Sequence, residues 1–388
     1  MLKYQITQNG NKIDYVLLVM VLALVVVGIF AVFSSSAYVA QFKYNNSAYF
    51  LIRQVIYTIV GLIGMFVAMK LDFYHLRKYS KVMIIGNAFL LMCTYFSFLG
   101  GTVVNGANGW IIIPVINQGF QPSEIAKIVA LIYVANILAY PNYKNLDIFT
   151  RILTTIPIAG LLGIVVFQPD MGNTSIITMA VLSVYFSAGL SKKLILSVMS
   201  FVGVLVTAII ASNPYQLDRV LFFLNPWQDP QGKGFQLIQS LLAVGSGGIT
   251  GRGLGQSIQK LFYLPESHND FIFAVFAEET GLIGTLTMIF FFFVVLTRGL
   301  NIAVKNKDSF IKLLCTGITI LITGQTFMNI GVVTGILPTT GITLPFISSG
   351  GTSMIVNLFC IGLLLNASSY TYTDWEVIEG NSNNNENF

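Results

Sequence analysis

The residues that could do chemistry in this chain are few and gather at three places. Glu124 and Lys127 stand three residues apart at the start of one apolar run, and Asp170 lies in a tight turn between two others. Five more ionisable residues crowd the entry to a later apolar run, namely Glu266, His268, Asp270, Glu278 and Glu279. Charged side chains in or beside apolar spans are costly and by default mark function, so these three places form the candidate site.

Asp270 is the strongest candidate for a catalytic group. It follows the turn Leu264-Pro265-Glu266 and precedes an abruptly apolar segment, so its carboxylate is expected at the boundary between water and an apolar phase. Partial desolvation there raises the pKa of a carboxyl group toward the range useful for a general base.

Structural roles stay open for the other candidates. Glu124 and Lys127 could form a helix-start ion pair that serves packing, and Asp170 could be a turn and N-cap residue. His268 could be an interfacial histidine without a catalytic role. One of the two adjacent glutamates of the later run is expected to be the structural partner of a cation.

Two glycine-rich segments, 245–248 and 251–255, precede the crowded run. They lack the preceding strand and the GK[ST] ending of a P-loop, but glycine lets backbone N–H groups approach a phosphate closely. Arg252 and Lys260 nearby could add positive charge, and a flexible loop is the alternative. Further on, Pro338 to Gly351 is predicted to form an irregular re-entrant turn, which is tolerated at membrane depth where it lines a cavity.

Composition determines the kind of protein that must hold these residues. Of the 388 residues, 55% are hydrophobic and only 10% are charged, whereas soluble domains carry roughly 25% charged residues. A soluble enzyme is therefore excluded. A membrane span needs roughly 20 apolar residues, so ten helical spans would use most of the apolar positions. We predict an all-α polytopic membrane protein with ten transmembrane helices.

Ten apolar runs are visible along the chain. They are Tyr15 to Phe33, Gln54 to Met69, Val82 to Leu99, Ile125 to Leu138, Ile152 to Phe167, Asn173 to Leu190, Leu194 to Ala211, Phe271 to Leu296, Leu313 to Val333 and Thr352 to Asn366. Each is expected to be a helix because a lipid-exposed backbone must satisfy its own hydrogen bonds.

The positions of Lys and Arg predict the orientation of these spans. With the N-terminus in the cytoplasm, 14 of the 21 Lys and Arg residues fall in inner segments, and two short outer connections, 100–123 and 334–351, carry none. The positive-inside rule then places both termini in the cytoplasm and the candidate acids at the outer ends of the spans. The net charge of +5 is thus a topology signal, and we expect no nucleic-acid partner.

The chain divides into a membrane domain, residues 1–369, and a tail, residues 370–388. A long outer loop, residues 212–270 between the seventh and eighth spans, contains many aromatic anchors, and we expect helices in it that lie on the outer leaflet. The tail is acidic and Asn-rich, and it is predicted to be disordered and cytoplasmic. The three cysteines are far apart and suggest neither a disulfide nor a metal site.

Six sequence motifs are spread in order over most of the chain. They are NGANGW (105–110), FQPSEIAK (120–127), QPDMGN (168–173), NPWQDPQGKGFQLIQSLLAVGSGG (225–248), LPESHNDFIFAVFAEETG (264–281) and GVVTGILPTTGITLPFISSGG (331–351). These motifs resemble the shape, elongation, division and sporulation (SEDS) family of peptidoglycan glycosyltransferases, which includes FtsW, RodA and SpoVE. The segment from Asp229 to Asp270 is closer to the division member FtsW than to the elongation member RodA.

Three positions depart from the family pattern. Gly109 stands where a basic residue commonly precedes the tryptophan, Ser349 stands where ISYGG is usual, and Phe262 stands where some division members have an acid. These departures concern the contacts that such an enzyme makes with its substrate.

The resemblance implies a ten-span polymerase that joins lipid II into glycan strands at the outer face of a bacterial cytoplasmic membrane, for cell division or cell shape. It also implies a class B penicillin-binding transpeptidase as partner, with other divisome or elongasome membrane proteins. Asp270 then corresponds to the catalytic aspartate of the family. Glu124, Lys127 and Asp170 fall on its polar central cavity.

Glycosyl transfer from a lipid diphosphate donor needs a base for the acceptor hydroxyl and positive charge for the departing diphosphate. Asp270 can supply the base. Candidate sources of the charge are Arg219, Arg252, Lys260, Lys127 and a divalent cation, Mg or Mn, held by carboxylates, and the sequence does not choose among them. Glu266, His268 and Ser349 complete the set of residues expected around the substrate.

Two other functions stay open from the sequence. A lipid II flippase or transporter would suit ten spans with intramembrane charge, but a translocation path should place polar residues near the midplane. A nonenzymatic scaffold for a transpeptidase would have little reason to hold acids at the membrane edge.

Overall fold

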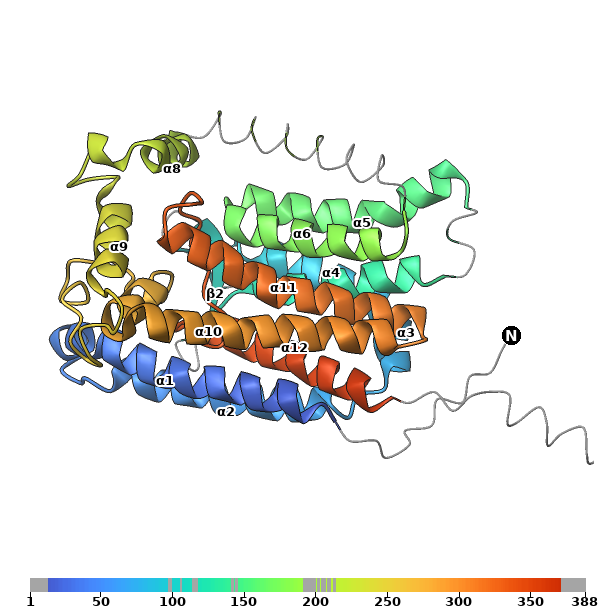
Figure 1. Cartoon of the computed structure of the whole chain (residues 1–388). Coiled ribbons are helices and arrows are strands. Elements are labelled where there is room, and N and C mark those ends of the chain that lie inside the picture. The colour runs from blue at the N-terminus through green and yellow to red at the C-terminus, as the bar shows by residue number, and fades with distance from the viewer. Residues whose placement is uncertain are drawn as a thin grey trace, which may run out of the picture.

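Long helices that run back and forth along one direction make up most of the computed structural model (Figure 1). The structure describes residues 13–96, 100–104, 107–113, 118–140, 143, 146–190, 200, 203, 207, 211 and 214–370. The helices are α1 (Tyr15–Tyr44), α2 (Tyr49–Ala68), α3 (Phe73–Cys93), α4 (Pro122–Leu138), α5 (Ile148–Phe167), α6 (Met171–Ser187), α8 (Pro214–Leu224), η3 (Pro226–Gln228), α9 (Phe235–Ser246), α10 (Ile272–Lys305), α11 (Ser309–Val333) and α12 (Gly351–Ser369).

The predicted helical membrane fold is confirmed. Within the described residues, six helices are long and apolar enough to cross a membrane, namely α1, α2, α5, α10, α11 and α12. The predicted fourth and sixth spans are the shorter helices α4 and α6, with 17 residues each. The seventh predicted span, Leu194 to Ala211, lies outside the described residues except for four positions. The count of ten therefore stays a prediction.

An aspartate begins five of the helices. Its carboxylate accepts a hydrogen bond from a backbone N–H of the first turn, which otherwise has no intrahelical partner. These residues are Asp14 in α1, Asp72 in α3, Asp147 in α5, Asp170 in α6 and Asp308 in α11. The cap at Asp72 begins α3 well before the predicted apolar run, which starts at Val82. The prediction left out these first turns because they contain the charged residues Arg77, Lys78 and Lys81, whereas the run was defined by apolar residues.

The expectation of an all-α fold is wrong in one segment. Strands β1 (Gly101–Val104), β2 (Ala107–Ile113) and β3 (Gln118–Phe120) form a three-stranded antiparallel sheet in the order β1-β2-β3. Thr102 pairs with Trp110, and Ile111 pairs with Phe120. The sheet leads directly into α4, so it delivers Trp110 and Gln121 to the same end of the bundle.

The long predicted loop contains helices, as expected. Helices α8 and α9 and the short η3 lie at the end of the bundle where α10 begins (Figure 1). Whether they lie on the outer leaflet stays a prediction. The predicted disordered tail, apart from Tyr370, is outside the described residues.

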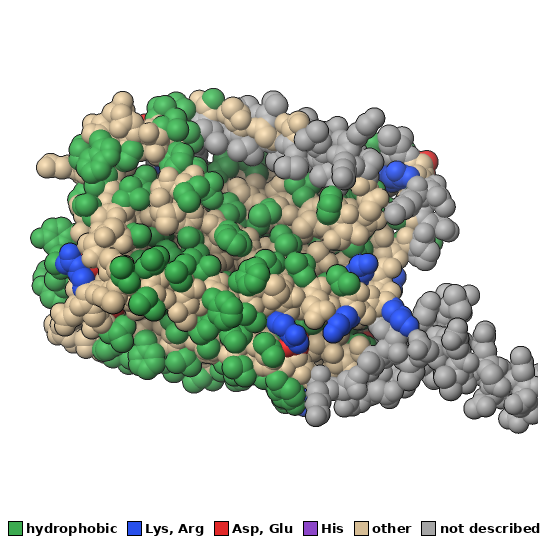
Figure 2. Space-filling model, viewed as in Figure 1, with side chains coloured by type: hydrophobic (Ala, Val, Ile, Leu, Met, Phe, Trp, Pro, Cys, Tyr) green, Lys and Arg blue, Asp and Glu red, His purple; other side chains and the backbone are tan. Residues whose placement is uncertain are grey.

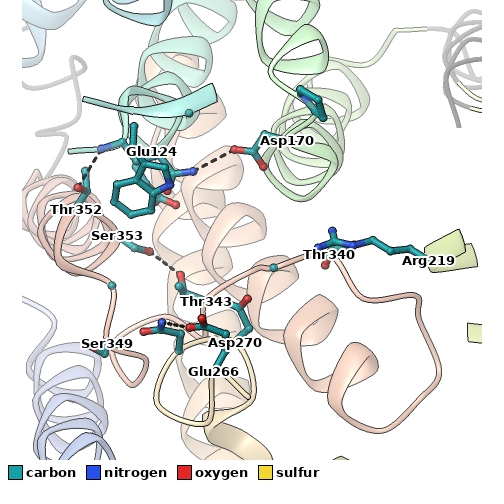
Figure 3. Close-up of a pocket in the computed structure, with 17 residues that line it drawn as sticks. Glu124, Asp170, Arg219, Glu266, Asp270, Thr340, Thr343, Ser349, Thr352 and Ser353 are labelled. Carbon is teal, nitrogen blue, oxygen red and sulfur yellow. Dashed lines mark hydrogen bonds between the residues drawn. The ribbon is translucent and has the colours of Figure 1, made fainter. Parts of the chain in front are cut away.

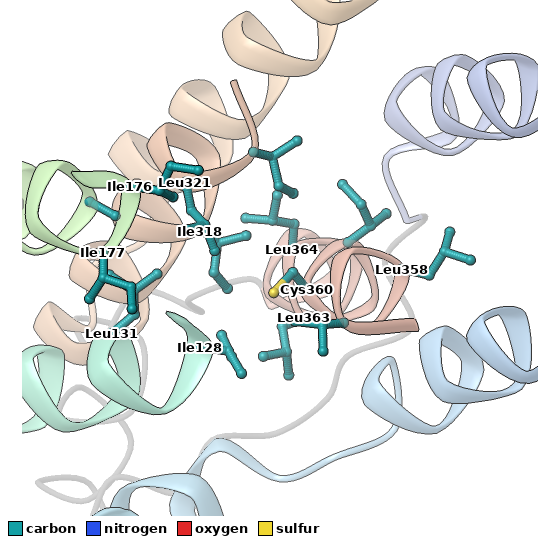
Figure 4. Packing of buried hydrophobic residues seen from close by; sticks show 14 of the residues in the cluster. Ile128, Leu131, Ile176, Ile177, Ile318, Leu321, Leu358, Cys360, Leu363 and Leu364 are labelled. Carbon is teal, nitrogen blue, oxygen red and sulfur yellow. The ribbon is translucent and has the colours of Figure 1, made fainter. Parts of the chain in front are cut away.

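The core is centred on α4, α11 and α12. In the most apolar windows of α11 and α12, 78% and 72% of residues are buried, against 17% to 33% in α1, α2, α5 and α10. Figure 4 shows Ile128 and Leu131 of α4 packed near Ile318 of α11 and Cys360 of α12. Exposed hydrophobic side chains cover much of the outer surface in Figure 2, as expected of helices that face lipid.

A glycine allows α12 and α2 to pack closely. A Cβ atom at Gly362 would lie 2.4 Å from the carbonyl oxygen of Met65 and 2.7 Å from the Cβ atom of Ala68. By contrast, a Cβ atom at Gly64, on α2, would meet nothing within 4 Å.

We expect Gly362→Val to lower the free energy of unfolding by about 1–3 kcal/mol, because the backbone of α2 must move away from the added side chain. Gly64→Val is the matched control and should be nearly neutral. Thermal unfolding of the purified protein in detergent measures both. Equal midpoints for the two variants would contradict the close contact at Gly362.

Candidate active site

A pocket of about 440 Å³ lies at the end of the bundle where α10 and α12 begin (Figure 3). Six of the ten residues predicted for the site line it, namely Glu124, Asp170, Arg219, Glu266, Asp270 and Ser349. The three places identified in the sequence therefore meet in one cavity. Gly109 and Ser349, two departures from the family pattern, also line it, whereas Phe262 packs edge-on against Tyr38 and Phe42 elsewhere.

Asp270 is held by its backbone. It stands two residues before the first residue of α10, and its carbonyl oxygen accepts a hydrogen bond of 2.7 Å from Nδ2 of Asn329. The same amide group donates to the carbonyl oxygen of Ile342 at 2.7 Å. Asn329, on α11, thus ties the Asp270 loop to the turn that precedes α12.

Two further hydrogen bonds fasten these loops together. The hydroxyl of Ser348 donates to the carbonyl oxygen of Asn269 at 2.7 Å. The backbone N–H of Ser349 donates to the carbonyl oxygen of His268 at 3.0 Å. Residues 337–350 are irregular and contribute Thr340, Gly341 and Thr343 to the pocket wall. The prediction of an irregular turn that lines a cavity is confirmed.

The pocket makes Asp270 a stronger base than an ordinary aspartate. Burial raises the pKa of its carboxyl group to about 7, and the neighbouring Glu266 and Asp170 carboxylates act in the same direction while Arg219 opposes them. In Figure 3, Asp270 and Glu266 lie next to each other. A carboxylate with a pKa near 7 is suited to accept a proton at neutral pH.

Asp170 is both a helix cap and a pocket residue. Its Oδ1 atom accepts from the N–H of Asn173 at 3.0 Å and begins α6. Its Oδ2 atom accepts from Gln121, Ser123 and the side chain of Asn173 at 3.1, 3.2 and 2.7 Å. The structural and the functional interpretation of Asp170 are therefore compatible, because one oxygen caps the helix and the other joins a polar network in the pocket wall.

Glu124 and Lys127 form a buried ion pair behind the pocket. Nζ of Lys127 lies 2.8 Å from Oε1 of Glu124, and the two side chains are 1% and 6% exposed. Nζ also donates to Oε1 of Gln325 at 3.1 Å, and Gln325 donates to the carbonyl oxygen of Thr343 at 2.9 Å. Glu124 lines the pocket and Lys127 does not, so Lys127 can influence the site through Glu124 and Gln325.

The structure does not place Arg252 and Lys260, two candidate sources of positive charge, among the residues that line the Asp270 pocket. Nζ of Lys260 lies 2.7 Å from Oε1 of Glu279, and Nε of Arg252 lies 3.5 Å from Oε1 of Glu278. The physical reason is that these two glutamates are buried in α10 and need compensating charge. The expectation that one of the glutamates has a structural cation partner is confirmed.

The glycine-rich segment 251–255 packs against a break in α10. Gly281 has φ 66° and ψ −163°, which interrupts the helix, and the N–H groups of Arg252 and Gly253 donate to the carbonyl oxygens of Glu278 and Glu279 at 2.9 and 3.0 Å. A Cβ atom at Gly251 would lie 2.2 Å from the Glu279 carbonyl oxygen. Gly251 and Gly281 thus allow the loop and the helix to pack closely. The N–H groups of Arg252 and Gly253 are hydrogen-bonded to α10, so they are not available to a phosphate.

His268 lies outside the pocket lining. Its ring packs on Phe50 with the ring centroids 4.4 Å apart. Burial lowers the pKa of its imidazole, with Lys43 acting in the same direction against Glu266. This placement fits a structural histidine in its neutral form.

Two residues that the sequence reasoning passed over connect the site. Gln325 and Asn329 are buried amides four residues apart on α11, within an otherwise apolar span. Four-residue spacing places both on one face of a helix, and buried amides in apolar spans are usually hydrogen-bonded across helices. Two amide residues with four-residue spacing in an apolar run could therefore have indicated a buried polar contact in the sequence.

The described residues contain no group of three or more His, Cys, Asp or Glu side chains that could hold a metal ion. Glu266 and Asp270 nevertheless line the same pocket, and Mg²⁺ is commonly bound through one or two carboxylates together with substrate phosphates. The carboxylates present therefore fit a divalent cation that arrives with a diphosphate.

Comparison with known proteins gives consistent results. Residues 15–373 match the family model described as cell cycle protein, FtsW/RodA/SpoVE. A probable peptidoglycan glycosyltransferase FtsW from Geobacter metallireducens is 40% identical over 360 residues, which cover 92% of this chain and 95% of that protein. Stage V sporulation protein E of Bacillus subtilis is 38% identical over 371 residues, which cover 94% of this chain and 99% of that protein.

Two solved structures have a similar fold. A chain from a peptidoglycan synthase complex, studied for the structural coordination of polymerization and crosslinking, aligns with a TM-score of 0.71 and 28% identity over 93% of this chain and 99% of that chain. The rod shape determining protein RodA of Thermus thermophilus aligns with a TM-score of 0.67 and 25% identity over 93% of this chain and 98% of that chain.

The placement of Lys260 leads to a prediction about stability. Lys260→Met leaves Glu279 buried without its cation, so we expect a loss of about 3–5 kcal/mol in the free energy of unfolding. Lys233→Met is the control, because Lys233 pairs with Asp218 at the surface with its side chain 55% exposed, and such pairs contribute roughly 0–1 kcal/mol. Thermal unfolding in detergent compares the two. Similar losses would show that the Lys260–Glu279 pair is not a structural element.

Proposed function

The chain belongs to the FtsW, RodA and SpoVE family of cell cycle proteins, and from this membership we propose that it is a peptidoglycan glycosyltransferase that polymerises lipid II. The observation that carries the proposal is the placement of Asp270. Its carboxyl group, with a pKa of about 7, lines a pocket with Glu266, Asp170 and Arg219 at one end of a helical membrane bundle. Relatives of similar length carry the name peptidoglycan glycosyltransferase.

The proposed reaction needs one proton acceptor and one site of positive charge. Asp270 accepts the proton of the acceptor sugar hydroxyl while the hydroxyl oxygen attacks the anomeric carbon of the donor. The bond from that carbon to the lipid diphosphate breaks, and the diphosphate leaves with the electron pair. Arg219, in the pocket wall, is the candidate that stabilises the leaving charge, and a divalent cation, when bound, would supply further positive charge.

A lipid-linked substrate fits the position of the pocket. The sugars of lipid II are polar and its polyprenyl chain is apolar, so the reactive bond belongs at a membrane surface. We propose that the Asp270 end of the bundle is the outer face of a bacterial cytoplasmic membrane, with both termini in the cytoplasm, as the Lys and Arg distribution predicts.

We infer the partner from the same family. The solved relative belongs to a complex that coordinates polymerization with crosslinking. A class B penicillin-binding transpeptidase that crosslinks the new strands is therefore the proposed partner of this chain. The polymerase is preferred to a lipid II transporter because the relatives are named as enzymes and the pocket contains a base for glycosyl transfer.

The decisive variant is Asp270→Asn, which keeps the side-chain shape and removes the base. Purified protein with its transpeptidase partner and lipid II should form long glycan strands in the presence of penicillin, and the variant should lose at least about 100-fold in rate. Asp218→Asn, at an exposed ion pair, is the matched control and should keep its activity. If Asp270→Asn polymerises normally, Asp270 is not the base; if wild type only moves lipid II across vesicles, the transporter is favoured.

The raised pKa of Asp270 predicts how the rate depends on pH. The base acts only when deprotonated, so the rate should rise with pH and reach half its maximum near pH 7. Glu266→Gln removes a charge that raises this pKa and should move the midpoint to lower pH. Arg219→Gln removes a charge that lowers it and should move the midpoint to higher pH.

Rates of strand formation at saturating lipid II, from pH 5.5 to 8.5, test this prediction. Lys312→Gln, an exposed residue on the first turn of α11 at the other end of the bundle, is the control and should leave the midpoint unchanged. Shifts of Glu266→Gln and Arg219→Gln in the same direction would contradict the assignment.

A further inference from the structure

A second cavity lies at the opposite end of the bundle from Asp270. It has a volume of about 550 Å³ and is formed by the start of α1, the end of α10 and the end of α12. Helix α10 begins at the Asp270 pocket and ends here; the part after its break at Gly281, residues 282–305, is roughly 36 Å long, and the turns before the break add to this. The two cavities are therefore separated by about the thickness of a membrane with its headgroup layers.

We propose that this cavity binds the phosphate of an anionic phospholipid headgroup. Among the residues that the structure describes, the cationic side chains of Arg298, Lys305 and Lys307 and the carboxylate of Asp14 line it. Lys305 and Lys307 are exposed. Basic pockets between membrane helices are suited to anionic headgroups, and each Lys or Arg near the membrane surface contributes about 1 kcal/mol to that attraction.

Arg298 is held in place at the cavity. Nη2 of Arg298 lies 2.6 Å from Oδ2 of Asp14, and its Nε atom donates to the same oxygen at 2.9 Å. Asp14 also caps α1 by accepting from the N–H of Leu17 at 3.0 Å, so its position is fixed. The guanidinium side chain stays 38% exposed, which leaves part of it available to an anion.

The surface next to the cavity is apolar, which favours a lipid over a soluble phosphate. Tyr15, Val16 and Val19 on α1 are 57%, 45% and 58% exposed, and Val304 on α10 is 73% exposed. Tyr15 and Val16 also line the cavity. A phosphate at the lysines therefore has room beside it for acyl chains against these side chains. Tyrosine is common at this depth, where aromatic side chains meet the headgroups.

Another anion could reach the same cavity. Tyr370 lines it, and the chain continues from there into the acidic segment 371–388, which contains Asp374, Glu376, Glu379 and Glu386. The phospholipid is favoured because its acyl chains can cover the exposed side chains of Val16, Val19 and Val304 beside the lysines, and the experiment distinguishes the two.

Native mass spectrometry of the full chain in detergent tests the proposal with dioleoyl phosphatidylglycerol and dioleoyl phosphatidylcholine as probes. Wild type should retain phosphatidylglycerol in preference to phosphatidylcholine. Lys305→Gln with Lys307→Gln should weaken phosphatidylglycerol binding about 30-fold, from roughly fivefold for each lysine, and leave phosphatidylcholine unchanged. Lys78→Gln with Lys81→Gln removes the same charge from exposed positions on α3 outside the cavity and should have little effect.

Three results would overturn the proposal. An equal loss in both double variants would show a general surface-charge effect. Displacement of phosphatidylglycerol by an equal concentration of glycerol phosphate would show a site for soluble phosphates. A preference for phosphatidylglycerol that appears only after residues 371–388 are deleted would identify the acidic tail as the occupant. None of these outcomes depends on glycan polymerisation, so the proposal stands or fails separately from the proposed function.

Discussion

Each charge inside this apolar bundle must be compensated, and the rest of the site depends on how that is done. Glu124 is paired with Lys127 at 2.8 Å, and Glu279 with Lys260 at 2.7 Å. Taking such groups out of water costs several kcal/mol per ion, which only good geometry and further hydrogen bonds offset. Gln325 supplies that further contact to Lys127, and Ser34 supplies it to Glu279 at 2.6 Å.

Asp270 is positioned in a different way. Its backbone is fixed by Asn329, while burial and Glu266 outweigh Arg219 and keep the pKa of its carboxyl group high. A rigid backbone orients the side chain, and a raised pKa lets it exchange a proton near neutral pH. The structural carboxylates of α10 are paired with cations, whereas the Asp270 carboxylate lines the pocket.

Much of the fold and part of the site could be predicted from the sequence. Apolar runs locate most of the helices because burial in lipid requires long apolar segments, and the costly charges at positions 124, 170 and 270 pointed to one pocket. The pairing of Lys260 could not be predicted because its partner, Glu279, lies 19 residues further along the chain, and the glycine-rich segment meets α10 at the break at Gly281. The sheet at 101–120 was missed because its short strands have no membrane-length apolar run, and Asn329 was missed because an amide carries no charge to draw attention.

The distribution of burial explains how one bundle can serve a lipid-linked substrate. Helices α4, α11 and α12 are mostly enclosed by protein, and they supply the Glu124 pair, Asn329 and Ser353 around the pocket. Helices α1, α2 and α5 present much of their surface to lipid. A polar centre is therefore surrounded by an apolar rim that can stay in contact with a bilayer, which is the arrangement that the proposed lipid-linked substrate requires. Helix α10 belongs to both parts, since its first turns bury two paired glutamates next to the Asp270 loop and its last turn carries Lys305 at the opposite surface. Its two ends thus lie at the Asp270 pocket and at the basic cavity, at opposite ends of the bundle.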